Sequence, residues 1–286
     1  MKKNSKKPEL SIIIPTLNEE ETLPLLLESL RKNLKKIKAE VIIVDGYSED
    51  KTVKVAKKSK VKNLKVFLCH RGPAHQRNYG AEKAKAPLLL FLDADVILPR
   101  NFLRRALEEI EERKLDVAAV CCKVKESGLW EKFCYDFMAN LWMRLFERIK
   151  PFGHCCFFIK KELHKKICGF DETLSFGEDS EYLERAKKAG GKFRILKGGK
   201  FIASARAFKK YGRSQSIALA YLNVYRLFGG ERRKEKKLES LYGKFTKFSP
   251  TYIENKIKEE IKKVVEFEKE LANRYFYLKD FNIKQF

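Results

Sequence analysis

The 286-residue chain lacks several features that define large protein classes. No apolar run approaches the roughly 20 residues that cross a bilayer, so we expect no membrane-spanning helix. The basic N-terminus leads into a short strand-like segment, which argues against a signal peptide. The seven cysteines include no CxxC pair, and their odd number disfavours a disulfide framework. We therefore expect buried free thiols and a cytoplasmic protein.

Negative charge is also scarce. The chain has 38 Asp and Glu residues and 62 Lys and Arg residues, which gives a net charge of +24. Such a surplus suits an anionic partner: nucleic acid, an acidic lipid surface or a phosphorylated substrate. A surface rich in Lys and Glu is also typical of heat-adapted proteins, so charge alone does not choose. We expect no nucleic-acid partner, because no helix-turn-helix, RNA-binding aromatic motif or zinc finger is visible.

Strand-like and helical segments alternate through the first half of the chain. Apolar strands are expected at 10–15, 40–45, 64–69 and 87–93, and helices at 19–37, 51–59, 73–86 and 100–113. This alternation predicts an α/β fold, a Rossmann-like and mostly parallel sheet with helices on both faces. There is no GxGxxG motif, so a dinucleotide enzyme is not indicated.

The second half is less regular. We expect a strand at 116–124, a helix at 127–149 and an amphipathic helix that begins near Glu178. Residues 209–286 predict a basic helical C-terminal extension. We therefore expect a first domain at 1–208 and the extension at 209–286. The first domain would comprise a nucleotide-binding half at about 9–115 and an acceptor half at about 116–208.

Polar residues follow three of the expected strands, at 15–19, at Asp45 and at 93–95. Ligands bind at the carboxyl ends of parallel strands, so these residues should lie along one rim. Asp93 and Asp95 are two apart in an extended segment and can turn to the same side. Together they could hold Mg²⁺ or Mn²⁺. The alternative is two solvated aspartates in a loop.

Two further segments carry candidate site residues. "HRGPAHQRNYGA" brings Arg71 and Arg77, which can hold phosphate oxygens, although exposed arginines beside a helix N-terminus are the alternative. "GFDETLSFGEDSEYLERAKKAG" places Glu178 and Asp179 at a helix start. They could be ordinary caps, or one carboxylate could deprotonate a hydroxyl nucleophile.

The series "SIIIPTLNEEETL", "VIIVDGYSED", "RGPAHQRNYGA", "FLDADVILP" and "GFDETLSFGEDSEYLERAKKAG" resembles the family 2 glycosyltransferases. The resemblance covers roughly residues 9–206, in the family's order and spacing. It implies the GT-A fold, a nucleotide-diphosphate sugar donor and transfer with inversion. It also implies donor contacts from Pro15, Leu17, Glu19, Asp45, Asp93, Ala94 and, from "SARA", Arg206.

The same resemblance assigns the chemistry. Asp95 is implied as the direct ligand of a diphosphate-bound Mg²⁺ or Mn²⁺, with Asp93 beside it. Asp179 is implied as the general base and Glu178 as its supporting carboxylate. The sequence departs from the family pattern at Gly46, where a second aspartate is common, and at Tyr47, which is bulky where glycine is usual. Ala207 also replaces a frequent second arginine.

The resulting functional prediction is sugar transfer to a hydroxyl or lipid-phosphate acceptor, glycan or polyprenyl-linked. A nucleotidyltransferase is the alternative enzyme, disfavoured because "PTLNEEETL" is acidic where a glycine-rich basic loop would be typical. A basic nucleic-acid-binding protein is the non-enzyme alternative. The basic C-terminal helices and the helix with Trp130 and Trp142 could hold the enzyme peripherally on the inner, anionic face of a membrane, or they could simply pack on protein.

Overall fold

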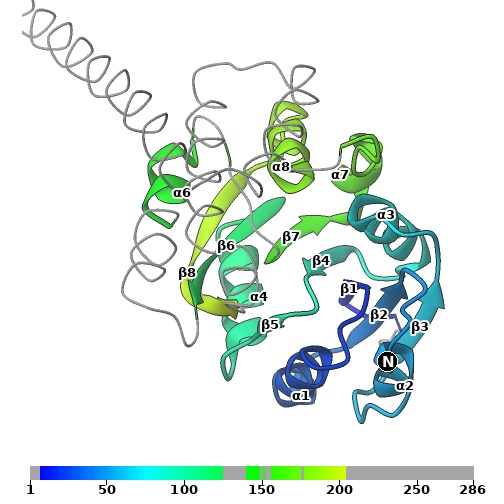
Figure 1. Cartoon of the computed structure of the whole chain (residues 1–286). Helices are drawn as coiled ribbons and strands as arrows, with labels where there is room; N and C mark the ends of the chain where they lie inside the picture. The colour runs from blue at the N-terminus through cyan, green and yellow to red at the C-terminus, as the bar shows by residue number, and fades with distance from the viewer. Residues whose placement is uncertain (1–6, 125–139, 149–150, 152–155, 175–176, 204–286) are drawn as a thin grey trace, which may run out of the picture. The chain divides into compact units, whose positions relative to one another are not determined.

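A computed structural model describes residues 7–124, 140–148, 151, 156–174 and 177–203 (Figure 1). The described strands are β1 Leu10–Thr16, β2 Ala39–Asp45, β3 Leu64–Leu68, β4 Leu88–Leu92, β5 Val96–Ile97, β6 Val117–Val124, β7 Cys156–Lys160 and β8 Phe193–Ala203. The described helices are α1 Leu23–Asn33, η1 Leu34–Lys36 (3-10), α2 Thr52–Lys57, α3 Pro73–Lys83, α4 Phe102–Glu112, α6 Asn140–Phe146, α7 Lys161–Lys166 and α8 Glu178–Lys188.

The described strands form one sheet in the order β3-β2-β1-β4-β7-β6-β8-β5. β3, β2, β1 and β4 run parallel to one another, and so do β6 and β8. β7 runs antiparallel to both β4 and β6, and β5 antiparallel to β8. The predicted α/β class with a mostly parallel sheet is confirmed, and the described part of β8 and all of β7 and β5 are additions to the predicted strands.

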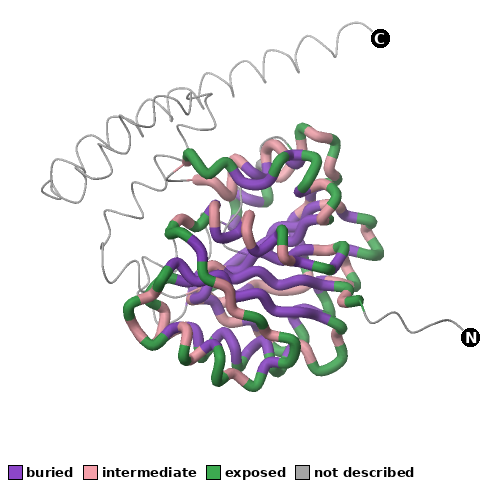
Figure 2. Tube along the Cα trace, turned by 90° about the vertical axis from the view of Figure 1, so that its right-hand side faces the viewer, coloured by how far each residue is buried: buried purple, intermediate pink, exposed green. Residues whose placement is uncertain are grey.

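Helices cover both faces of the sheet (Figures 1 and 2). Alternate strand residues such as Ile12 and Val41 belong to the core that α1, α2 and α4 share. On the other face α3 packs so close that a Cβ on Gly80 would lie 2.5 Å from Cγ2 of Ile13. Glycine is required there because no side chain fits between the helix and the strand.

An aromatic cluster fills the same face between α7, α8 and the middle of the sheet. Phe91 of β4 lies 4.9 Å from Phe170, edge to face, and Phe170 stacks on Tyr182 of α8 at 4.0 Å between ring centroids. His164 of α7 joins this cluster and shares a 2.6 Å hydrogen bond with the Tyr182 hydroxyl. Burial lowers the pKa of His164 to about 4, so the ring is neutral at physiological pH.

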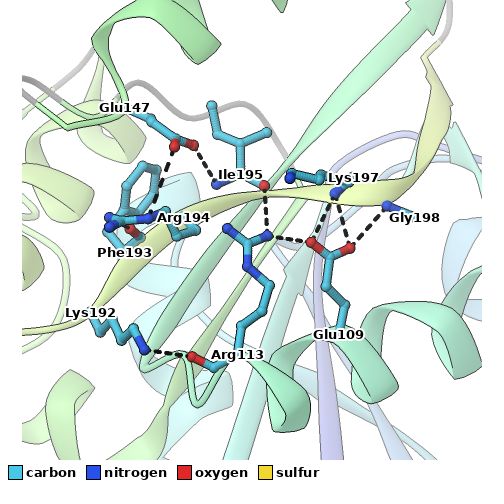
Figure 3. A network of polar contacts seen from close by, with 9 residues as sticks. All are labelled: Glu109, Arg113, Glu147, Lys192, Phe193, Arg194, Ile195, Lys197 and Gly198. Atoms are coloured by element: carbon cyan, nitrogen blue, oxygen red, sulfur yellow. Dashed lines mark hydrogen bonds and ion pairs between the residues drawn. The ribbon is translucent and has the colours of Figure 1, made fainter.

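β8 contains a large bulge. Ile195 pairs with Ala119 and Lys200 pairs with Cys121, so four residues of β8 lie opposite one of β6. The carboxylate of Glu109 on α4 accepts the backbone N–H groups of Lys197 at 2.9 Å and Gly198 at 2.9 Å (Figure 3). The helix thereby satisfies donors that the neighbouring strand leaves unpaired.

Several expectations change in detail. α1 begins at Leu23 and not at residue 19, and the backbone N–H groups of Glu19 and Glu20 donate to the side chains of Thr52, at the start of α2, and Asp50, just before it. Free thiols are confirmed for the described cysteines, but Cys168 is exposed, whereas Cys69, Cys121, Cys122 and Cys156 are buried. Among the described helices none is long and apolar enough to span a membrane. Trp130, the predicted extension at 209–286 and the 208/209 boundary lie outside the described residues.

Candidate functional site

The site is built on the rim where β1, β2 and β4 end. Thr16 pairs with Asp45 at the ends of β1 and β2, and β4 runs parallel on the other side of β1. The loops after these strands therefore start at the same edge of the sheet, as expected. Pro15, Asp45 and Asp93, predicted from three separate segments, thus share one rim.

Asp45 is fully buried and organises its own loop. Its carboxylate accepts the Thr16 hydroxyl at 2.8 Å, the Ser48 hydroxyl at 2.6 Å and the Ser48 backbone N–H at 2.8 Å. In this structure Asp45 holds the loop, and a contact with base or ribose stays a prediction.

The loops after β1 and β2 are tied to each other and to α3. The backbone N–H of Asn18 donates to the Ser48 hydroxyl at 2.9 Å, and Gln76 of α3 donates to the carbonyls of Thr16 at 2.9 Å and Val44 at 2.8 Å. These bonds satisfy backbone groups where the ladder ends. Leu17 projects from this frame with 38% of its surface exposed. Glu19, at the far end of the loop, accepts the Thr22 hydroxyl.

At the heart of the site lies a buried guanidinium among three carboxylates. Arg77 of α3 is 3% exposed and donates to Asp93 at 2.8 Å and to Glu178 at 2.8 Å. Its Nη1 also lies 3.3 Å from Oδ1 of Asp179, and the Phe170 ring packs 5.4 Å from its guanidinium carbon. Burial favours the neutral form, but Asp179, Asp93 and Glu178 together raise the pKa of Arg77, which stays charged. One cation thus joins the end of β4 to the start of α8.

Asp179 carries a buried carboxylate that is only partly paired. Its side chain is 17% exposed, and its Oδ1 is buried with no hydrogen bond from the described part of the chain. Burial raises the pKa of Asp179 to about 7, against the attraction of Arg77 and with added repulsion from Glu178 and Asp93. A carboxylate with a pKa near neutrality can accept a proton and is suited to general base catalysis.

The segment that carries Asp179 is anchored to α3. Asn78 donates to the Phe170 carbonyl at 2.9 Å and accepts its backbone N–H at 2.7 Å. Glu172 bonds to Asn78 at 2.8 Å and to His75 at 2.9 Å. α3 therefore contacts both halves of the site through two neighbouring residues, Arg77 and Asn78.

Asp93 and Asp95 offer hard oxygen ligands at the rim. Asp93 is 34% exposed and Ala94 between them is buried. Among the described residues no group of three His, Cys, Asp or Glu is placed to hold a metal ion. Mg²⁺ is commonly held by one or two carboxylates together with substrate phosphates, so this donor set fits a cation that arrives with a diphosphate.

Arg71, in the segment between β3 and α3, lies against the loop after β2. Its guanidinium donates to the carbonyl of Gly46 at 3.2 Å and of Tyr47 at 3.4 Å, and pairs with Glu49 at 2.7 Å. Arg71 packs against Gly46, since a Cβ there would lie 3.5 Å from Cα and Cγ of Arg71. In this structure Arg71 fixes the Gly46–Tyr47 turn, and a phosphate contact stays a prediction.

The sequence prediction therefore contained most of the residues that meet here, but not how they meet. Arg77 is predicted to hold phosphate oxygens; in this structure it contacts carboxylates, and a phosphate contact stays a prediction. Gln76, Asn78, Phe170 and Glu172 were not singled out, although polar side chains inside a helix with little apolar surface were a usable signal for the first two. Arg206 lies outside the described residues.

Comparison with known proteins agrees with this architecture. The sequence model of glycosyl transferase family 2 matches residues 11–168. The poly(ribitol-phosphate) beta-N-acetylglucosaminyltransferase TarS of Staphylococcus aureus (strain Mu50) is 34% identical over 120 residues, which are 40% of this chain and 21% of TarS. The chain thus spans about a fifth of that relative.

Solved structures share the fold. The structure of S. aureus TarS with UDP-GlcNAc superposes with a TM-score of 0.58 at 23% identity, covering 76% of this chain and 66% of that one. The mannosyltransferase PcManGT of Pyrobaculum calidifontis with GDP-Man and Mn²⁺ gives 0.58 at 20% identity, covering 77% and 65%. The predicted GT-A fold is confirmed. The chain belongs to glycosyl transferase family 2.

Proposed function

We propose that this protein transfers a sugar from a nucleotide-diphosphate sugar to an acceptor, with inversion at the anomeric carbon and with the help of Mg²⁺ or Mn²⁺. The observation that carries the proposal is the Arg77 cluster. It joins Asp93, beside the predicted diphosphate site, to Asp179, whose raised pKa suits proton abstraction. Family membership and the UDP-GlcNAc and GDP-Man complexes of the structural neighbours support a nucleotide-sugar donor.

The donor would lie along the rim, its diphosphate near Asp93 and Asp95. These two carboxylates would hold the cation, which when bound neutralises charge that grows on the leaving diphosphate. Arg77 keeps Asp93 and Asp179 at fixed positions around one guanidinium. Pro15, Leu17, Glu19 and Asp45 surround the nucleoside end, as the family resemblance implies, and Arg71 and Arg206 are proposed to reach the donor's phosphates.

Asp179 would take the proton from an acceptor hydroxyl as its oxygen attacks the anomeric carbon. The bond from that carbon to the diphosphate oxygen breaks on the opposite face, so a single displacement inverts the configuration. Glu178 keeps Arg77 paired and, by repulsion, supports the raised pKa of Asp179. A lipid-phosphate acceptor is already ionised, and Asp179 would then orient it.

The acceptor is proposed as a glycan or a polyprenyl-linked sugar, made at the cytoplasmic side. TarS is named for a poly(ribitol-phosphate) acceptor, a phosphate-rich polymer. The net charge of +24 suits such an anionic acceptor or an anionic membrane surface contacted peripherally.

The test is a calorimetric titration with nucleotide sugars, with Mn²⁺ and with chelator, followed by a transfer assay. Asp95→Asn should remove cation-dependent donor binding. Asp179→Asn should bind the donor and lose transfer to a hydroxyl acceptor. Glu184→Gln, on the same helix and paired with Lys188 at 2.9 Å, is the matched control and should behave as wild type. Full transfer by Asp179→Asn would refute the assignment, and pyrophosphate release from a nucleoside triphosphate would indicate the nucleotidyltransferase instead.

A further inference from the structure

Tyr47 has an unusual backbone. Its φ is +60°, in the left-handed region that glycine and asparagine tolerate best. Three of the other five non-glycine residues described with positive φ are asparagines, and Tyr47 is the aromatic one. A bulky aromatic residue is costly in this conformation, and such strain collects at functional sites. Its side chain gains no compensating burial, because Tyr47 is 53% exposed.

The surrounding contacts hold the residue in this state. On one side Arg71 donates to the carbonyls of Gly46 and Tyr47 itself. On the other side Ser48 donates twice to the buried carboxylate of Asp45. The backbone of the turn is therefore fixed from both ends, and the phenol ring of Tyr47 is attached to a fixed position at the rim.

The ring lies where the nucleoside end of a donor would fall. β4, which ends just before Asp93, is separated from β2, which ends two residues before Tyr47, by β1 alone, so the two strand ends are about 10 Å apart at the usual strand spacing. That separation suits a diphosphate at one position and a base at the other. The ring of His70 lies 6.4 Å from that of Tyr47, and the exposed Leu17 lies on the loop that Asn18 ties to Ser48.

We propose that Tyr47 is a nucleobase-stacking residue of the donor site, with His70 beside it as a second aromatic surface. This inference rests on the proposed function. Every nucleobase has an aromatic face, so the ring contributes affinity without a hydrogen-bond code, and base choice is left to other groups of the loops after β1 and β2. The hydrogen bonds that fix the turn offset the backbone strain at Tyr47. The ring is therefore already in place for stacking, which lowers the cost of ordering it when the nucleotide binds.

The experiment measures binding of UDP, GDP, ADP, CDP and dTDP to the full chain in Mn²⁺, with pyrophosphate as the probe that has no base. Tyr47→Gly should weaken the nucleoside diphosphate that wild type binds best by about 5- to 150-fold, the range expected for a lost base–aromatic stack. Binding of pyrophosphate should not change. Tyr47→Phe should bind the nucleotide as wild type does.

The same variant should be more stable without ligand, because glycine relieves the positive φ. We expect a melting temperature about 2–4 °C above wild type. Lys114→Gly is the matched control, since Lys114 is exposed, has φ +51° and lies on the loop between α4 and β6. It should gain stability in the same way and leave nucleotide binding unchanged.

The outcomes separate the two proposals. If wild type binds none of the five nucleotides, the proposed function is overturned. If wild type binds one and Tyr47→Gly binds it equally well, only the role of Tyr47 is overturned. An equal loss for pyrophosphate and nucleotide would also overturn it, because the loop and not the ring would then carry the effect.

Discussion

The raised pKa of Asp179 predicts a stability signature that needs no substrate. An aspartate with a pKa of 3.8 when unfolded and about 7 when folded prefers to stay protonated in the native state. The stabilisation that this preference gives is complete below pH 3.8 and is lost as the pH rises through about 7. Asp179→Asn carries no such group, so its stability relative to wild type should increase over this interval.

The magnitude follows from the size of the shift. About three pKa units correspond to about 4 kcal/mol over the whole titration, at about 1.4 kcal/mol per unit. Between pH 5 and pH 8, where most proteins can be measured, the expected gain of Asp179→Asn over wild type is about 2–3 kcal/mol. With its side chain 17% exposed, Asp179 is shielded from most solvent screening.

The assay is urea unfolding of both proteins at several pH values, because urea leaves ion pairs unscreened. Glu184→Gln is again the control, and its difference from wild type should stay flat. Parallel curves for wild type and Asp179→Asn from pH 5 to pH 8 would refute the raised pKa. The same ionisation predicts that transfer to a hydroxyl acceptor rises with pH to a plateau, with a midpoint near pH 7.

Three further predictions concern the Arg77 cluster and α3. Glu178→Gln removes a repelling charge beside Asp179, so the midpoint of the pH–rate profile should move to lower pH; a midpoint that stays or rises would contradict this. Arg77→Met leaves three carboxylates together and should cost about 3–5 kcal/mol in urea unfolding at pH 8, with a smaller loss at pH 5, where Asp179 is protonated. An equal loss at both pH values would show that packing alone explains it. Gly80→Ala places a methyl group 2.5 Å from Ile13 and should lower the melting temperature, since overpacking costs about 1–3 kcal/mol and alanine regains about 1 in a helix; a higher melting temperature would contradict the close approach.

Sequence reasoning worked best for the first half of the fold. The parallel strands from β1 to β4 are predominantly apolar runs, and α1 between β1 and β2 has clear amphipathic spacing. β7 is not predicted because an apolar run of five residues cannot be assigned by periodicity alone, and its antiparallel pairing departs from the alternation of strands and helices in the first half. β8 was missed because "KGGK" interrupts its pattern, and the bulge that explains this depends on Glu109, nearly ninety residues away.

The site was predictable residue by residue but not as an arrangement. Asp93, Glu178 and Asp179 were selected from local motifs, and Asp93 and Asp45 were placed on one rim by strand order. Arg77 meets Glu178 across 101 positions of sequence, a separation that no spacing rule covers. Its burial could not be read from the sequence either, since an arginine near a helix N-terminus is ordinarily exposed.

The meeting of Arg77 with Glu178 and Asp179 also bears on the order of events during synthesis. A nascent chain that has emerged only as far as α4 contains Arg77 and Asp93 but neither acid of α8, and Asn78 still lacks Phe170. Its guanidinium then has one carboxylate partner in place of three, and the exposed face of α3 has no cover. The amino-terminal half can form its strands early, but the set of three carboxylates around Arg77 is complete only after residue 179 has left the ribosome.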